Sequence, residues 1–76
     1  MGSIKLLLRE DQQRADGTAP IYLRIIQQRR TRFVATGLRV EPRFWDARRQ
    51  QVRRSHPLAA VMNRKLQNLK LQAEAA

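Results

Sequence analysis

The chain of 76 residues contains no cysteine, one histidine (His56) and only six acidic residues. The absence of cysteine excludes a disulfide scaffold and a thiolate zinc site. One histidine and a few scattered carboxylates cannot assemble a metal centre, so the sequence predicts neither a metal nor another cofactor. A chain without cysteine also fits a reducing compartment, and we expect a cytoplasmic protein.

Long apolar runs are missing as well. The longest one, from Leu58 to Met62, is far shorter than the roughly 20 residues that a membrane-spanning helix needs. The N-terminal stretch MGSIKLLLRE has too short an apolar run for a secretory signal, and an acidic cluster follows it in place of a small-residue cleavage site. The sequence therefore predicts no membrane partner.

Negative charge is scarce relative to positive charge. Sixteen Lys and Arg residues face six Asp and Glu, which gives a formal net charge of +10, and 13 of the 16 are arginine. The planar guanidinium group suits phosphate oxygens and guanine edges, whereas an ammonium group is a point charge. A solubilising basic surface is the simpler explanation, but the choice of arginine favours nucleic acid as the partner.

Three segments alternate apolar and polar residues with the period of a β-strand. They predict strands at about 3–9, 20–27 and 31–38, with Gly37 ending the third. A polar loop that contains Asp16 and Gly17 precedes the second strand.

The connections between these segments carry weaker signals. The stretch from Gln27 to Arg30 lacks the Gly or Asn of a tight hairpin, so we expect a looser turn there. The aromatic pair Phe44 and Trp45 is expected to plug one edge of the core. Residues 47–54 are predicted to form a loop with Val52 as its anchor.

Apolar residues at spacings of three and four predict an amphipathic helix at about 56–73, with Ser55 as its N-cap. Its apolar face comprises Leu58, Val61, Met62, Leu66, Leu69 and Ala73. One helix of this length covers one face of a small sheet. We therefore predict a single α+β domain over residues 1–76, in which a three-stranded antiparallel sheet packs on one C-terminal α-helix.

The second face of the sheet would then meet water or a partner. Alternation assigns to the helix side Ile4, Leu6, Leu8, Ile21, Leu23, Ile25 and Phe33. The open face would show Lys5, Leu7, Arg9, Tyr22, Arg24, Ile26, Arg32, Val34 and Thr36. Such a surface could enter the major groove of DNA. The candidate DNA-binding residues are Lys5, Arg9, Tyr22, Arg24, Arg32, Val34 and Thr36, flanked by Arg29, Arg30, Arg39 and Arg43.

Nothing in the sequence favours catalysis. The acidic residues lie in loops and around turns, where carboxylates more often shape the backbone than act as general bases. His56 precedes a proline and is best explained as a helix-entry residue. The three glycines are isolated, so no phosphate-cradling loop is present.

An ordered set of short motifs resembles the N-terminal arm-type DNA-binding domain of phage and conjugative-transposon integrases, which are tyrosine recombinases. The matching positions, which span nearly the whole chain, are Asp16, Gly17, Pro20, Ile21, Arg24, Ile25, Thr36, Gly37, Leu38, Trp45, Asp46, Asn63 and Leu66. The resemblance implies a three-stranded sheet that enters the major groove of double-stranded arm-type sites during DNA integration and excision.

The resemblance also implies that this chain is a fragment of a longer integrase, encoded by a bacterium or a phage. The catalytic residues of that integrase would lie in a later domain, so this chain is not expected to be an enzyme. Other integrase protomers are possible partners of the full-length protein, and we expect the isolated domain to be monomeric.

Two other functions remain open. A basic sheet with one helix would also suit an RNA-binding or ribosome-associated module, although such modules stack bases on exposed aromatics and only Tyr22 is assigned to the open face. The chain could instead be a protein-interaction domain that uses the Leu58–Leu69 helix face. That function would require the helix face to be left uncovered by the sheet.

Overall fold

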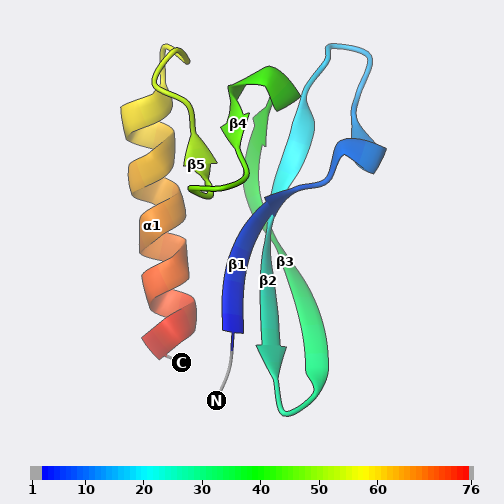
Figure 1. Ribbon diagram of the computed structural model, residues 1–76, viewed down its shortest axis with the longest axis vertical. Helices are drawn as coiled ribbons and strands as arrows, with labels where there is room; N and C mark the ends of the chain where they lie inside the picture. Colours follow the sequence, from blue (N-terminus) through cyan, green and yellow to red (C-terminus); the bar gives the residue numbers. More distant parts are fainter. Residues whose placement is uncertain (1–2, 76) are drawn as a thin grey trace.

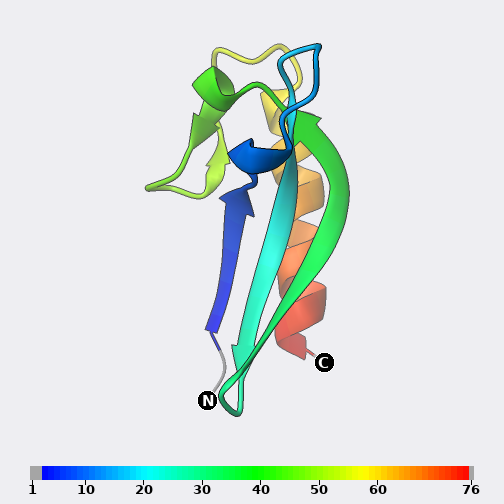
Figure 2. The same cartoon turned by 90° about the vertical axis from the view of Figure 1, so that its right-hand side faces the viewer.

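The computed structural model describes residues 3–75 and confirms the predicted α+β architecture (Figure 1). Strands β1 (Ser3–Leu8), β2 (Ala19–Gln27) and β3 (Arg30–Val40) form an antiparallel sheet in the order β1-β2-β3. Helix α1 (Ala59–Ala75) packs on one face of this sheet, as the turned view shows (Figure 2). Within these residues no helix combines the length and the apolar character that crossing a bilayer requires.

The connections between these elements add short pieces. The 3-10 turns η1 (Glu10–Gln12) and η2 (Pro42–Phe44) follow β1 and β3 respectively. After η2 the chain forms a small hairpin from β4 (Trp45–Asp46) and β5 (Gln51–Val52), so the loop expected at 47–54 is only the tip and the exit of a hairpin. Val52 does anchor it, because its side chain is fully buried.

The core lies between the sheet and α1, and its β1–β2 part agrees with the alternation of the sequence. Leu6 pairs with Leu23 and Leu8 with Ile21, so these side chains share the face that α1 covers. Trp45, Val40 and Val52 close the core at the end where the small hairpin sits. Phe44 is half-buried against the same cluster.

The turn between β2 and β3 is tighter than the sequence predicts. Gln27 pairs with Arg30, which leaves a two-residue loop of Gln28 and Arg29 with φ angles of 51° and 65°. Positive φ at both loop residues is the type I′ arrangement, whose twist matches that of the flanking strands. Neither residue is Gly or Asn, so the hairpin forms in spite of an unfavourable backbone conformation at its tip.

This turn fixes the face on which each β3 residue lies. Arg24 pairs with Phe33, Ile25 with Arg32 and Leu23 with Val34. Directly paired residues point to the same side of a sheet. Phe33 therefore lies on the open face, and Arg32 and Val34 lie on the helix side, which reverses the assignment made from alternation alone.

The third strand does not end at Gly37 but continues to Val40 through an irregularity. Tyr22 pairs with Ala35 and Pro20 with Arg39, so β3 carries extra residues opposite Ile21. Gly37 adopts a φ of 82° there, which a residue with a Cβ rarely tolerates. This bulge bends β3 and brings Val40 into the core.

Two polar side chains of the β4–β5 hairpin hold it in place. The carboxylate Oδ1 of Asp46 accepts the backbone N–H groups of Arg48 and Arg49 at 3.1 and 3.0 Å and shapes the hairpin tip. Gln50 accepts the backbone N–H of Leu6 at 2.9 Å, which ties the hairpin to the outer edge of β1. The edge of the sheet is thereby partly covered.

Asn63 joins this hairpin to α1. Its amide group makes two hydrogen bonds to the backbone of Val52, accepting from the N–H at 2.7 Å and donating to the carbonyl at 3.0 Å. The short strand β5 thus receives from one helix side chain what a neighbouring strand would otherwise supply. Leu66, one turn later, packs into the core with Val52.

Helix α1 begins later than expected, at Ala59 rather than near residue 56, and ends at Ala75 rather than at 73. The backbone N–H of Leu58 donates to Nδ1 of His56 at 3.0 Å, so His56 and not Ser55 supplies the side-chain acceptor at the helix entry. Only part of the predicted apolar stripe is buried. Met62 and Leu66 face the core, as does Ala59 outside the predicted stripe, whereas Leu58 and Val61 are 57% and 67% exposed.

The β2–β3 turn can be tested by giving it the residues that its conformation prefers. We expect the double variant Gln28→Asn/Arg29→Gly to raise the free energy of unfolding by about 1–2 kcal/mol, after the extra chain entropy of glycine is subtracted. A thermal unfolding curve would show a rise in Tm of roughly 4–8 °C per kcal/mol. An unchanged Tm would contradict strain at this turn.

The Asn63 bridge provides a second test with a matched control on the same helix. Asn63→Ala leaves both backbone groups of Val52 without their partner, and we expect a loss of about 1–3 kcal/mol in the free energy of unfolding. Asn68→Ala alters an exposed position of α1 and should change it by less than about 0.5 kcal/mol. Urea denaturation measures both, and equal losses would refute the proposed role of the bridge.

Candidate nucleic-acid interface

The face of the sheet opposite α1 combines cations with aromatic and aliphatic groups. Across β1 and β2, Lys5 pairs with Arg24 and Leu7 with Tyr22. Across β2 and β3, Arg24 pairs with Phe33 and Tyr22 with Ala35. Because paired residues share a face, these side chains form one continuous surface, which we call the open face.

Arg9 extends this surface just beyond the end of β1. Its backbone N–H donates to the carbonyl of Pro20 at 3.0 Å and so continues the β1–β2 pairing by one residue. Its guanidinium carbon lies 5.5 Å from the ring centroids of both Tyr22 and Phe33. These are cation–π distances, so one arginine links the two aromatic rings of the open face.

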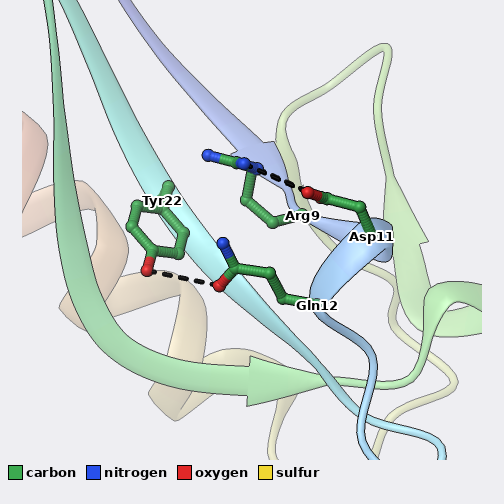
Figure 3. Close-up of polar contacts among 4 residues, drawn as sticks. All are labelled: Arg9, Asp11, Gln12 and Tyr22. Carbon is green, nitrogen blue, oxygen red and sulfur yellow. Dashed lines mark hydrogen bonds and ion pairs between the residues drawn. The ribbon is translucent and has the colours of Figure 1, made fainter.

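Two side chains of η1 form hydrogen bonds with Arg9 and Tyr22 (Figure 3). The carboxylate of Asp11 accepts two hydrogen bonds from Arg9, from Nε and Nη2, each at 3.1 Å. The Tyr22 hydroxyl donates to Oε1 of Gln12 at 3.5 Å. The hydrogen bond and charge of Asp11 raise the pKa of Arg9, and the hydrogen bond from Arg9 lowers the pKa of Asp11.

Arg24 occupies the centre of the open face, between Lys5 on one neighbouring strand and Phe33 on the other. Its side chain is half-buried, and its Nε is shielded from solvent with no hydrogen-bond partner among residues 3–75. Its charge is not neutralised by an ion pair with any acid in that part of the chain. A cation placed in this way is suited to an external anion or acceptor.

The tip of the β2–β3 hairpin forms the far end of the same surface. Arg29 and Arg30 are exposed there, next to Gln27 and Gln28, and residues 27–32 contain no acidic side chain. The opposite end carries the acidic turn η1. The open face is therefore polarised, with free cations at the hairpin tip and a neutralised arginine beside η1.

Three predicted contact residues lie elsewhere. Arg32 and Val34 project from β3 on the helix side, where Val34 borders a shallow apolar groove formed with Leu69 and Ala73. The hydroxyl of Thr36 donates to the carbonyl of Ile21 at 2.7 Å and is committed to the bulge.

Two of the flanking arginines are engaged within the domain. Arg39 donates to the hydroxyl and carbonyl oxygens of Thr18 and to the carbonyl of Gln12, which fastens the loop between β1 and β2. Arg43 pairs with Glu41 at 3.0 Å and lies over the Phe44 ring at 4.7 Å. Arg39 is thereby engaged in the fold, whereas the Arg43 side chain is 73% exposed, and contact of either residue with a DNA backbone stays a prediction.

The sequence prediction missed Phe33, which is 50% exposed on the open face, and the η1 residues Asp11 and Gln12 that organise Arg9 and Tyr22. Phe33 was assigned inward because large apolar residues favour cores. The only signal that could have corrected this is the length of the β2–β3 turn. No local sequence pattern predicts that η1 lies close to β2.

Asp16 and Asp46 act on the backbone, as expected from their positions in turns, whereas Asp11 and Glu41 pair with arginine side chains. Asp16 accepts the N–H and the hydroxyl of Thr18 at 2.9 and 2.7 Å, in the turn that Gly17 completes with a φ of 87°. Among residues 3–75 no group of three His, Asp or Glu side chains comes together to hold a metal ion. What this surface can do chemically is bind an anionic, hydrogen-bonding partner.

A basic sheet face that carries aromatic side chains and is backed by one helix defines a small nucleic-acid-binding domain. The family profile of the Arm DNA-binding domain matches residues 6–76, and the chain belongs to that family. It is thus a DNA-binding domain of the type found at the N-termini of integrases, a non-catalytic module. No curated protein and no solved structure matches the chain.

The carboxylates predict a defined pH dependence of stability. The backbone N–H groups of Arg49 and Arg48 lower the pKa of Asp46, so its contribution is complete above the unfolded value of about 3.9 and is lost as pH falls through the lower folded value. Asp46→Asn keeps the acceptor oxygen but removes the charge. We expect the variant to be less stable than wild type above about pH 5 and to converge with it near pH 2.

Urea denaturation between pH 2 and pH 7 measures this convergence. Asp46→Ala provides the comparison, because it removes the acceptor as well and should stay less stable than wild type at every pH. A constant difference between wild type and Asp46→Asn over the whole range would show that the Asp46 charge contributes nothing to folding.

Proposed function

We propose that this chain is the accessory DNA-binding module of a site-specific tyrosine recombinase. The module binds double-stranded arm-type sites through the open face, which enters the major groove during integration and excision of DNA. The observation that carries the proposal is the placement of Lys5, Arg9 and Arg24 with two aromatic rings on the one sheet face that α1 leaves uncovered.

The dimensions of the sheet support this docking mode. Three strands spaced about 4.8 Å apart span roughly 10 Å between the outer backbones. The major groove of B-DNA is about 12 Å wide and admits strands as well as a helix. Among residues 3–75, no other helix or strand lies against the sheet edge at β3 or against the hairpin tip, so the backbone of a duplex has access to them (Figures 1 and 2).

The residues divide into two groups on this proposal. Arg29 and Arg30 at the hairpin tip are exposed, and neither β2 nor β3 contains an acidic residue, which suits contact with phosphates. Lys5, Tyr22 and Arg24 lie on the strands and would face base edges at the bottom of the groove. Phe33 offers the apolar surface that a thymine methyl group prefers.

Such a module raises the local concentration of the recombinase without touching the site of strand exchange. A catalytic domain of the same protein would act at core sites while this domain holds an arm site, so that one protomer bridges two DNA segments. Apparent affinity at the core would increase through effective concentration rather than through new contacts there.

Binding of single-stranded RNA is a second candidate, and one observation favours it. Phe33 joins Tyr22 on the open face, so the sheet carries two aromatic rings where bases could stack. However, the guanidinium of Arg9 lies over both rings and occupies a position that a base would need. Duplex DNA is therefore the better fit.

A protein-interaction role for the Leu58–Leu69 helix face has less support. The middle of that face, at Met62 and Leu66, is buried by the domain's own core. Leu58 and Val61 remain exposed, but they lie beside the buried stripe rather than forming the uncovered face that this role requires.

Arg24→Ala tests the proposed binding face, with Arg64→Ala on the exposed side of α1 as the matched control. Fluorescence anisotropy with a labelled 20-base-pair duplex at several salt concentrations gives the affinity and its salt dependence. We expect Arg24→Ala to weaken binding, by roughly 1–3 kcal/mol on a sequence in which it reads a base. Arg64→Ala should leave the affinity within about two-fold of wild type.

The salt dependence identifies the kind of contact that Arg24 makes. With about six phosphates neutralised, log K of wild type should fall against log salt with a slope near −5, and Arg24→Ala should reduce the slope by about 1 only if Arg24 touches a phosphate. Equal losses of DNA affinity in Arg24→Ala and Arg64→Ala would refute binding through the open face. Stronger competition by single-stranded RNA than by unlabelled duplex would favour the second candidate.

A further inference from the structure

The guanidinium group of Arg9 has one edge occupied and one edge free. Asp11 takes the edge formed by Nε and Nη2, with both hydrogen bonds at 3.1 Å. The end-on edge consists of Nη1 and the second hydrogen of Nη2, and it donates to no acceptor among residues 3–75. Two N–H groups in a fixed fork are therefore available to a partner outside the domain.

The orientation of this free edge is fixed before any partner arrives. Asp11 holds the side of the guanidinium, and the rings of Tyr22 and Phe33 lie 5.5 Å from its carbon. The Tyr22 hydroxyl in turn makes a long contact of 3.5 Å with Oε1 of Gln12. An arginine that is already ordered loses less conformational entropy on binding than a free one, so its hydrogen bonds contribute more to affinity.

We propose that Arg9 determines specificity by reading a guanine in the major groove, with O6 and N7 as the acceptors of its end-on edge and Asp11 as the positioning residue. This inference rests on the proposed function, because it requires the open face to enter the groove. Arginine bonded to both guanine acceptors is the commonest base-specific contact in such interfaces, and the geometry of the free fork matches it.

The charge of Asp11 decides between a base and a phosphate as the target. A phosphate at the free edge would approach a carboxylate that already neutralises Arg9, and repulsion between the two anions would offset the attraction. A guanine edge is neutral and offers two acceptors. An adenine edge would place an N6 donor against the guanidinium donors and is rejected.

Arg29 and Arg30 provide the contrast within the same domain. They are exposed on a segment without acidic residues, and no aromatic ring fixes them among the described contacts. They suit phosphates at many positions along a duplex. The pairing with Asp11 thus suits Arg9 to one oriented contact with a base, whereas Arg29 and Arg30 suit non-specific attraction of phosphates.

Selection from a randomised duplex pool tests the proposal. Wild type should enrich sites with a guanine at one defined position, and Arg9→Ala and Asp11→Asn should both lose the preference at that position while keeping the others. The matched control is Glu10→Gln, which removes the neighbouring acid of η1 that is not paired with Arg9. This control should retain the full preference.

A chemical change in the DNA supplies a readout that does not depend on protein variants. Replacing the selected guanine by 7-deazaguanine removes the N7 acceptor, and wild type should bind this duplex roughly 5- to 150-fold more weakly. Arg9→Ala, which removes the donors, should show less than a two-fold difference between the two duplexes. Thermal unfolding of each variant verifies that the fold is retained.

The outcomes separate this inference from the proposed function. If wild type enriches no sequence, DNA reading by the open face fails and the inference fails with it. If wild type enriches a site but Asp11→Asn merely raises affinity for all duplexes, Asp11 is only a repulsive charge and the inference alone is overturned. Wild type that is indifferent to 7-deazaguanine at every selected guanine overturns it as well.

Discussion

The two-residue turn of Gln28 and Arg29 is the constraint on which the functional surface depends. It pairs Gln27 with Arg30, and the pairing then propagates along β2 and β3 so that Arg24 stands beside Phe33. Since side chains alternate across a strand, a register different by one residue would bring Arg32 and Val34 to the open face and send Phe33 to the helix. The turn at the hairpin tip thus determines which side chains lie on the face that we propose binds DNA.

Most of the motif residues that reveal the family build the scaffold rather than the binding surface. Asp16 and Gly17 shape the loop before β2, and Thr36 and Gly37 form the bulge of β3. Asp46 orders a hairpin tip, and Asn63 joins that hairpin to α1. Arg24 is the member of the set that lies on the open face. This division is expected where a rigid frame presents side chains that can vary with the DNA sequence.

The arginines fall into two physical states in spite of their similar chemistry. Arg9, Arg39 and Arg43 are fixed by acceptors within the domain, and two of them are paired with a carboxylate. Arg24, Arg29 and Arg30 have no such ion pair among residues 3–75. Part of the positive charge counted in the net charge of +10 is therefore engaged in holding loops and turns. The attraction for an anion differs from one part of the surface to another. Of the remaining cations, Lys5 and Arg24 lie on the open face and Arg29 and Arg30 at the β2–β3 hairpin tip. Others lie on the helix side of β3, in the loops and on α1.

The sequence by itself determined the fold class, the family and the inward faces of β1 and β2, because alternation and helical spacing of apolar residues record burial directly. It also determined that arginine rather than lysine carries the charge. Only the tertiary structure decided the face of Phe33, Arg32 and Val34, the extension of β3 through its bulge, and the hairpin over residues 45–52. The alternation of apolar and polar residues indicates that a strand has two faces, but it does not indicate which element packs on each face. That choice depends on turn geometry and on contacts between distant segments, such as Arg9 with Phe33 and Asn63 with Val52, and no local pattern records these.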